Sequence, residues 1–252
     1  MSTKSPSTKA TTHFGYQDVA EDEKASLVRE VFDSVSPKYD LMNDLMSMGI
    51  HRLWKNTLLD MMRPKPGMTL VDVGGGTGDI AFRFLDRGGT DVKVIDINNE
   101  MLNHGRRRAI DQGRLTGLDW VNGDAEKLPI ATASADAYTT AFCIRNVTHI
   151  DAALREAARV LKPGGRFLCL EFSHVALPAL EKIYDLYSFS ILPWLGEMVA
   201  DDRDSYQYLA ESIRQFPDQQ QFTQMITDAG LELATYRNLS GGIAAIHSAW
   251  RL

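Results

Sequence analysis

The sequence predicts an α/β protein with a mostly parallel sheet that has helices on both faces. Strand-like and helix-like segments alternate from residue 68 to residue 172, and alternation of this kind forms a parallel sheet. The first strand runs into the glycine-rich turn VDVGGGTGD at residues 71–79 and then into an apolar helix. Such a turn lets the backbone approach a nucleotide-like ligand closely. A chain of 252 residues suffices for one large domain of this class.

The part of the chain before this alternation is predicted to cover the sheet. Residues 1–19 are predicted to be a disordered tail, because the first twelve are rich in Ser, Thr and Lys and lack an apolar cluster. Residues 20–66 are predicted to form an N-terminal helical lid. Apolar residues at helical spacing, such as Leu27, Val28 and Val31, support this prediction, and Pro37 interrupts the pattern. We expect this lid to lie over the sheet rather than to join it.

The lid, the alternating region and the segments after it are predicted to form a single domain, residues 20–252. Strands are predicted at residues 69–73, 91–96, 118–122, 135–142 and 166–172, and helices at 78–86, 99–112 and 151–161. An aromatic-rich helical insertion is predicted at residues 177–216. A helix at residues 218–229 then precedes strands at 231–236 and 243–250, and the short Gly-Gly turn before the last strand predicts a terminal antiparallel hairpin.

Composition excludes several classes of function. The formal net charge is −6, so no general attraction to nucleic acid is expected. The two cysteines, Cys143 and Cys169, lie in apolar runs and are interpreted as small buried side chains. The six histidines show no metal-binding spacing, so no metal site is expected. Because no signal peptide or bilayer-length apolar run is found, the predicted location is cytoplasmic.

The spacing of the glycine turn indicates which ligand it accepts. Gly74, Gly76 and Gly78 give G-x-G-x-G, and Asp79 stands where a dinucleotide loop carries its third glycine. A phosphate-binding P-loop would need a Gly-Lys-Ser/Thr ending, which this turn lacks. Acidic residues, Asp72 and Asp79, flank the turn, and it contains no cation. A positively charged ligand without phosphate, such as S-adenosylmethionine, is therefore predicted as the cofactor.

Two later strand ends carry residues that complete a cofactor site. Asp96 ends the second strand, 20 residues beyond Gly76, where a carboxylate accepts both ribose hydroxyl hydrogens; Ile97 follows it. After the third strand, Asp124 is predicted to accept from the adenine amino group and Ala125 to offer its backbone N–H to a ring nitrogen. An aspartate at a strand end is also a common turn residue, so each position alone has a structural alternative.

Six segments resemble a known family. They are VFDSVSPKYDLMNDLMSMGIHRLWK, VDVGGGTGD, VIDINNEML, NGDAEKLP, FCIRNV and RVLKPGGRFLCLEFS, in this order. They resemble the ubiquinone/menaquinone biosynthesis C-methyltransferases of the UbiE type, over roughly residues 32–252. The resemblance implies the Rossmann-like fold of class I S-adenosylmethionine-dependent methyltransferases and cofactor contacts at Thr77, Asp96, Asp124 and Ala125. The chain departs from many bacterial members at Ala141, where they carry a serine.

The resemblance also implies a reaction, C-methylation of the ring of a polyprenylated benzoquinol and, in some members, of demethylmenaquinol. A hydroquinone carbon becomes a good nucleophile when a neighbouring hydroxyl is ionised or strongly hydrogen-bonded. Arg145 and Asn146 follow the fourth strand and are predicted to be catalytic, with the guanidinium stabilising a phenolate-like oxygen or holding a water that accepts a proton. The alternative for Arg145 is an ion pair with Asp151 or another acid.

Further candidates lie in the lid and in the insertion. Tyr39 and Asp40 are predicted to be catalytic, with Asp40 an alternative base, and Asn43 to contact substrate; the alternative is a polar stripe that packs against the domain. Tyr206 and Tyr208 are predicted to meet the quinol oxygens. Weaker candidates are Glu171, His149 and His174.

The predicted partners are the polyprenyl quinol and other quinone-biosynthesis enzymes. Peripheral contact of the protein with the inner face of the membrane is also predicted, and a homodimer is left open. The aromatic insertion is the basis for membrane contact, and a helical cap filling its own small core is the alternative. Three rival functions stay open: methylation of another apolar molecule such as a sterol or phospholipid, nicotinamide-dependent oxidoreduction, and a non-catalytic scaffold.

Overall fold

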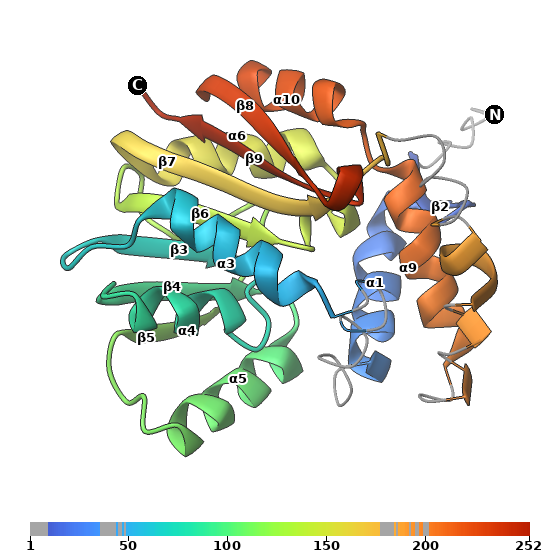
Figure 1. The fold of residues 1–252 in the computed structure, drawn as a ribbon, viewed down its shortest axis with the longest axis horizontal. Coiled ribbons are helices and arrows are strands. Elements are labelled where there is room, and N and C mark those ends of the chain that lie inside the picture. Colours follow the sequence, from blue (N-terminus) through green and yellow to red (C-terminus); the bar gives the residue numbers. More distant parts are fainter. Residues whose placement is uncertain are drawn as a thin grey trace, which may run out of the picture.

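The computed structural model describes residues 10–35, 44, 47, 49–176, 184, 186–191, 193–194, 197–198 and 202–252. A seven-stranded sheet lies between two layers of helices (Figure 1). The strand order is β5-β4-β3-β6-β7-β9-β8, and within this sheet β9 alone runs opposite to the other strands. The predicted α/β fold with its C-terminal antiparallel hairpin is therefore confirmed.

The strands lie close to their predicted positions, with one informative difference. The fifth strand of the alternation, β7, begins at Leu161, because the Lys-Pro-Gly-Gly segment forms an irregularity within the strand rather than a separate turn. Ala135 pairs with Leu161 and Ala137 pairs with Arg166, so the extra residues are absorbed as a bulge. The strands of the large sheet are β3 (Thr69–Val73), β4 (Asp91–Asp96), β5 (Leu118–Asn122), β6 (Ala135–Ala141), β7 (Leu161–Phe172), β8 (Glu232–Leu239) and β9 (Ala244–Trp250).

Two hydrophobic clusters, one on each face, hold the layers together. On one face, α3 (His51–Met62), α4 (Asp79–Asp86) and α5 (Asn99–Asp111) pack on strand residues such as Leu70 and Val94. On the other, α6 (Ile150–Val160) and α10 (Gln219–Asp228) pack on residues such as Val71 and Phe167. Successive strand residues point to opposite faces, which explains why β3 contributes to both clusters.

The predicted lid divides into two parts with different roles. Trp54, Leu58 and Leu59 of α3 are buried in the cluster on one face of the sheet, so α3 is a layer helix and not a lid. Helix α1 (Glu21–Val35) instead stands beside α9 (Arg203–Gln215), at the edge where the strands end (Figure 1). Helical spacing predicted both helices, but it could not tell which surface each one covers.

The prediction of a disordered tail through residue 19 is wrong for its second half. Strand β1 (Thr11–Phe14) pairs antiparallel with β2 (Gln17–Ala20). The hairpin is held by distant residues: the Phe14 ring stacks on Tyr208 with centroids 4.1 Å apart, and the Tyr16 N–H donates to Glu211 Oε2 at 3.0 Å. Composition alone cannot reveal contacts that span almost 200 residues.

Helix α9 lies in the predicted insertion and shares the main core. Tyr206, Leu209 and Ile213 are buried and belong to the same cluster as α3 and α4. A short π-helical segment, Tyr187–Ile191, precedes α9. None of the helices in the described ranges has the length and apolarity needed to cross a bilayer.

Candidate active site

A cleft opens at the carboxyl ends of the strands, where the strand order reverses between β3 and β6. Parallel α/β sheets bind ligands at this position, because the loops after the two strands diverge there. The cleft encloses about 860 Å³, counting space open to solvent, which suits a small-molecule ligand. Loops after β3, β4, β5 and β6 form its floor and sides, and α1 contributes Ala25, Val28, Arg29 and Phe32.

The glycine turn approaches the end of β6 closely. Gly74 and Gly76 line the cleft, with φ angles of 65° and 52° that favour glycine. A Cβ atom on Gly74 would lie 2.1 Å from Cys143 Sγ, so any side chain there would collide with the opposite loop. Thr77 and Gly78 continue the turn but do not line the cleft.

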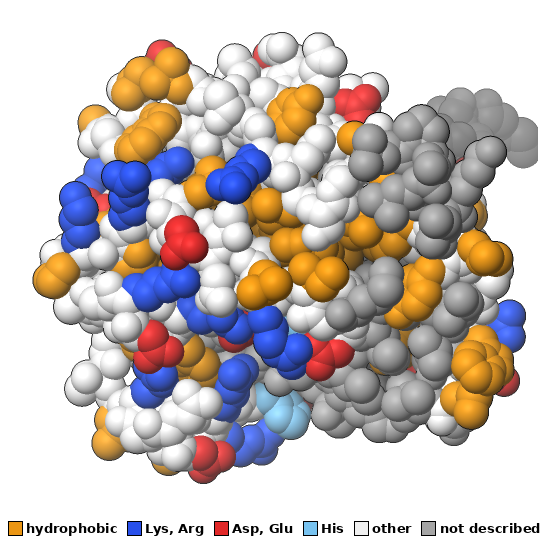
Figure 2. Space-filling model, viewed as in Figure 1, with side chains coloured by type: hydrophobic (Ala, Val, Ile, Leu, Met, Phe, Trp, Pro, Cys, Tyr) orange, Lys and Arg blue, Asp and Glu red, His pale blue; other side chains and the backbone are white. Residues whose placement is uncertain are grey.

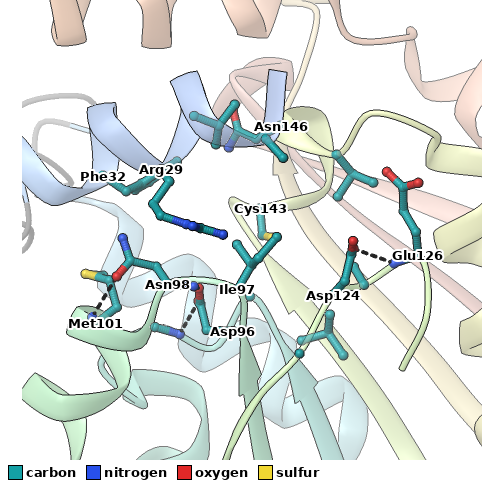
Figure 3. A pocket seen from close by; sticks show the side chains of 18 of the residues that line it. Arg29, Phe32, Asp96, Ile97, Asn98, Met101, Asp124, Glu126, Cys143 and Asn146 are labelled. Atoms are coloured by element: carbon teal, nitrogen blue, oxygen red, sulfur yellow. Dashed lines mark hydrogen bonds between the residues drawn. The ribbon is translucent and has the colours of Figure 1, made fainter. Parts of the chain in front are cut away.

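Asp96 is fixed at the centre of the cleft floor. Its Oδ2 accepts from the Gly76 N–H at 2.9 Å and its Oδ1 accepts from the Asn98 N–H at 2.8 Å (Figure 3). Burial raises the pKa of this carboxyl to about 6, although both backbone bonds oppose the shift. Ile97 lies beside it in the cleft. The carboxylate therefore has the fixed position that a ribose diol requires.

The loop after β5 brings a second acid to the cleft. Asp124 and Ala125 both line it, and Asp124 Oδ1 accepts from the Glu126 N–H at 2.9 Å (Figure 3). Glu126 also lines the cleft and bonds the ring of His149, with 2.7 Å between Oε2 and Nδ1. Sequence reasoning missed Glu126, since only its neighbours carry the adenine-type signal.

The two acids that flank the glycine turn were expected to present negative charge to the ligand, but they do not face the cleft. Asp72 is buried beneath the turn, where its Oδ1 accepts from Thr139 Oγ1 at 2.7 Å and burial raises its pKa to about 7. Asp79 is half-buried, and although this burial opposes ionisation, Lys55 and Arg83 outweigh it and bring the pKa of Asp79 down to about 2. Neither acid lines the cleft. Its negative character comes from Asp96 and the loop after β5 instead.

Arg145 forms a buried ion pair rather than a wall of the cleft. Its Nη1 donates to Glu171 Oε1 at 2.7 Å and its Nε donates to Ser212 Oγ at 3.3 Å. Both charged side chains are at most 2% exposed. The alternative left open by the sequence is therefore what the structure shows, with Glu171 as the acid. Asp151 pairs with Arg155 instead.

Asn146 lines the cleft and carries an unused donor. Its Oδ1 accepts from Tyr208 Oη at 3.0 Å, while its buried Nδ2 has no partner among the described residues. The Tyr208 hydroxyl is therefore engaged inside the protein. Tyr206 is fully buried, and neither tyrosine lines the cleft, which corrects their expected direct contact with substrate in this structure.

Three predicted site residues cannot be compared with the structure. Tyr39, Asp40 and Asn43 lie outside the described residues. Within the described ranges, no group of three or more His, Cys, Asp or Glu side chains could hold a metal ion.

Helix α1, part of the predicted lid, closes one side of the cleft, although the sequence analysis did not name the residues of α1 that line it. It is anchored near its start, where Lys24 Nζ donates to the Val147 carbonyl at 3.2 Å, and near its end, where Asn98 Nδ2 donates to Asp33 Oδ1 at 2.7 Å. Arg29 projects from it into the cleft (Figure 3). A signal existed in the sequence, because residues 25, 28, 29 and 32 share one helical face.

Solved structures show a likeness in fold. The putative methyltransferase in complex with the Haloferax volcanii Trm112 methyltransferase activator is 18% identical, with a TM-score of 0.63, over 89% of this chain and 97% of that chain. The [4+2]-cyclase SpnF is 17% identical, with a TM-score of 0.67, over 89% of this chain and 94% of that chain.

Curated relatives are much closer in sequence. The 2-methoxy-6-polyprenyl-1,4-benzoquinol methylase of Bos taurus, named as mitochondrial, is 53% identical over 96% of this chain and 84% of its own length. The ubiquinone/menaquinone biosynthesis C-methyltransferase UbiE of Roseobacter denitrificans is 56% identical over 96% of this chain and 97% of its own.

The predicted family, enzyme class and cofactor agree with these findings. The cleft also fits S-adenosylmethionine, because a fixed carboxylate, a close-approach glycine turn and a second acid face one space. The prediction of an S-adenosylmethionine-dependent methyltransferase is thus confirmed, and oxidoreduction is excluded as its family activity. Residues 17–251 match the ubiE/COQ5 methyltransferase family, and the chain belongs to that family.

Proposed function

We propose that this protein methylates a ring carbon of a polyprenylated benzoquinol of the 2-methoxy-6-polyprenyl-1,4-benzoquinol type, with S-adenosylmethionine as methyl donor. One observation carries the proposal. The cleft has fixed acids of the cofactor type on its floor and the unpaired Asn146 amide donor on another side. The name of the 53% identical Bos taurus relative supports the choice of acceptor.

The cofactor is assigned to the loops after β3, β4 and β5. Asp96 accepts from the ribose hydroxyls, with Ile97 beside it, while Asp124 and Ala125 receive the adenine. Gly74 and Gly76 allow the methionine part to pass close to the backbone. Thr77, Gly78 and Asp72 shape the turn from behind, since none of them lines the cleft. Bound in this way, the cofactor supplies the methyl group.

The acceptor is activated by hydrogen bonding to the oxygen next to the attacked carbon. Asn146 Nδ2 is assigned this bond, because it is a buried donor at the cleft with no other partner in the described part of the chain. Arg145 is less suited to this role, because it does not line the cleft and its guanidinium is engaged by Glu171 and Ser212. Tyr39 and Asp40 stay candidates for accepting the ring proton, and Asn43 for contacting the substrate.

The polyprenyl tail requires an apolar surface, and we place it at the end of the molecule near α9. Figure 2 shows hydrophobic side chains gathered at this edge. Tyr16 and Phe189 stack with centroids 6.4 Å apart, and other large apolar side chains there are also exposed: Leu186, Trp194 and Met198. This exposed apolar surface supports peripheral contact between the protein and the membrane that holds the substrate. Association with other quinone-biosynthesis enzymes and homodimer formation remain predictions.

A second acceptor, demethylmenaquinol, is proposed from the name of the Roseobacter denitrificans relative. The same geometry serves both rings, because each presents a hydroxyl next to the carbon that is methylated.

The proposal is tested with purified protein and methyl-labelled S-adenosylmethionine. Candidate acceptors are a short-chain 2-methoxy-6-prenyl benzoquinol, its oxidised quinone, demethylmenaquinol, a sterol and a phospholipid, and mass spectrometry identifies the labelled product. Label on the reduced benzoquinol but not on its quinone is expected, because only the quinol has an ionisable hydroxyl. Label on the sterol or phospholipid alone would reject the benzoquinol proposal.

A further inference from the structure

The orientation of the Asn146 amide is determined by a residue 62 positions away. Tyr208 Oη donates to Asn146 Oδ1 at 3.0 Å, and both side chains are buried. A primary amide has an accepting oxygen and a donating nitrogen, and the two differ little in size. If the amide turned over, the buried tyrosine hydroxyl would lose its acceptor. The Tyr208 bond therefore holds the amide in the orientation that leaves Nδ2 unpaired beside the cleft.

The donor is itself held in place by other contacts. The Tyr208 ring stacks on Phe14 of the β1–β2 hairpin, with an interplanar angle of 18°. The hairpin is attached to α9 in turn, because the Tyr16 N–H donates to Glu211 Oε2 at 3.0 Å. Burial raises the pKa of the Tyr208 hydroxyl, so the proton that it donates is retained in neutral and moderately alkaline solution.

The neighbouring cation is not positioned in this way. Arg145 is engaged by Glu171 and Ser212, which come from β7 and α9. At the end of β6, two adjacent side chains are thus fixed separately, Arg145 by an ion pair and Asn146 by a hydroxyl donor. Only Asn146 combines this fixation with a free donor at the cleft among the residues that the structure describes.

We propose that Tyr208 is a positioning residue for methyl transfer: by donating to Asn146 Oδ1, it keeps the Asn146 amide nitrogen directed at the acceptor oxygen of the substrate. The inference rests on the proposed function. It gives a role to the hydroxyl of a tyrosine that does not line the cleft, and it makes hairpin β1–β2 a support for that tyrosine through the Phe14 stack.

The test removes the hydroxyl and keeps the ring. Tyr208→Phe is expected to lower kcat at least tenfold and to leave the dissociation constant of S-adenosylhomocysteine unchanged, since the cofactor residues are untouched. The matched control is Tyr138→Phe, because Tyr138 is also buried and stacked, on Phe167, and lies in β6 outside the cleft lining. The control is expected to keep the wild-type kcat even if its thermal midpoint falls.

A double variant shows whether Tyr208 acts through Asn146. If it does, Tyr208→Phe combined with Asn146→Ala should be no slower than Asn146→Ala alone. Full kcat in Tyr208→Phe, or losses that multiply in the double variant, would overturn the inference.

A readout without substrate separates this inference from the proposed function. The side-chain amide protons of Asn146, assigned by their loss in Asn146→Ala, are followed by NMR in the protein with S-adenosylhomocysteine. Their chemical shift and solvent exchange should change in Tyr208→Phe but not in Tyr138→Phe. Absence of quinol methylation by the wild type would reject the proposed function, while unchanged amide signals in Tyr208→Phe would reject the positioning role.

Discussion

The two sides of the cleft differ in how far along the chain their supporting contacts reach. On the cofactor side, formed by β3, β4, β5 and the loops after them, Asp96 is held by backbone groups 20 and 2 residues away. On the cover side, formed by hairpin β1–β2, α1 and α9, the supporting contacts join residues 62 to 195 positions apart, such as Tyr208 with Asn146 and Tyr16 with Glu211. The cofactor side is thus built from local backbone geometry and the cover side from distant side chains.

The largest effect is expected where the cover side meets the sheet, at the Arg145–Glu171 pair. Arg145→Met and Glu171→Leu should each lower the free energy of unfolding by about 3–5 kcal/mol, because each leaves a buried charge without its partner. The double variant should recover most of this loss, since an apolar pair leaves no charge to compensate. Chemical denaturation of the three variants measures both effects. Additive losses in the double variant would contradict the assignment of the pair as mutually compensating.

A somewhat smaller effect is expected at Gly74, on the cofactor side. Gly74→Ala should lower the free energy of unfolding by about 2–4 kcal/mol, through left-handed backbone strain and the collision with Cys143. It should also abolish measurable binding of S-adenosylhomocysteine, because the turn must move. The control is Gly88→Ala, where φ is 90° but nothing lies within 4 Å of the added Cβ, so only the strain of about 1–2 kcal/mol applies. Equal losses in the two variants would show that the close approach to β6 is unimportant.

These contrasts explain how much the sequence could predict. The strands, the cleft at their ends and the presence of Asp96 and Asp124 in that cleft were predictable, because alternation and turn spacing are local properties. The ordered hairpin at Thr11–Ala20 was not, since Phe14 gains its partner from Tyr208. Pairing of Arg145 with an acid was foreseen as an alternative, but Glu171 was not identified as that acid, because the pair depends on how β6 and β7 align.

The cofactor side should also show a pH dependence set by Asp96. In the proposed cofactor site the ionised carboxylate accepts from the ribose hydroxyls, and burial raises its pKa to about 6. As the pH falls through this value the carboxyl becomes protonated, so affinity for S-adenosylhomocysteine should fall, approaching tenfold per pH unit below it. Calorimetric titrations from pH 5 to pH 8 measure the trend.

Two variants test the origin of that dependence. Asp96→Asn should bind about 10–100-fold more weakly at pH 8, as expected for loss of hydrogen bonds to a charged group, and should lose the pH dependence. Asp119→Asn, which removes the exposed partner of Lys93 on β5, should keep both the affinity and the trend. A slope that persisted in Asp96→Asn would assign the titration to another group.

The smallest effect is expected at His149, which contacts both sides. Its Nδ1 lies 2.7 Å from Glu126 Oε2, at the cleft, and its Nε2 lies 3.4 Å from Glu21 Oε2, at the start of α1. The bond to Glu126, with a smaller contribution from Glu21, raises the pKa of the imidazole above its usual value. The stabilisation is therefore complete below about pH 6.5 and is lost as the pH rises through the raised pKa.

His149→Asn should accordingly lower the thermal midpoint by a few degrees at pH 6 and hardly at all at pH 9, because exposed pairs contribute at most about 1 kcal/mol. Glu21→Gln decides which side His149 serves. If it reproduces most of the pH-dependent loss, the imidazole anchors α1 to the rim of the cleft. If only Glu126→Gln does so, His149 belongs to the cofactor side, and the start of α1 is held by other contacts, such as the bond from Lys24 Nζ to the Val147 carbonyl and the bond from the Glu21 N–H to the Ala10 carbonyl.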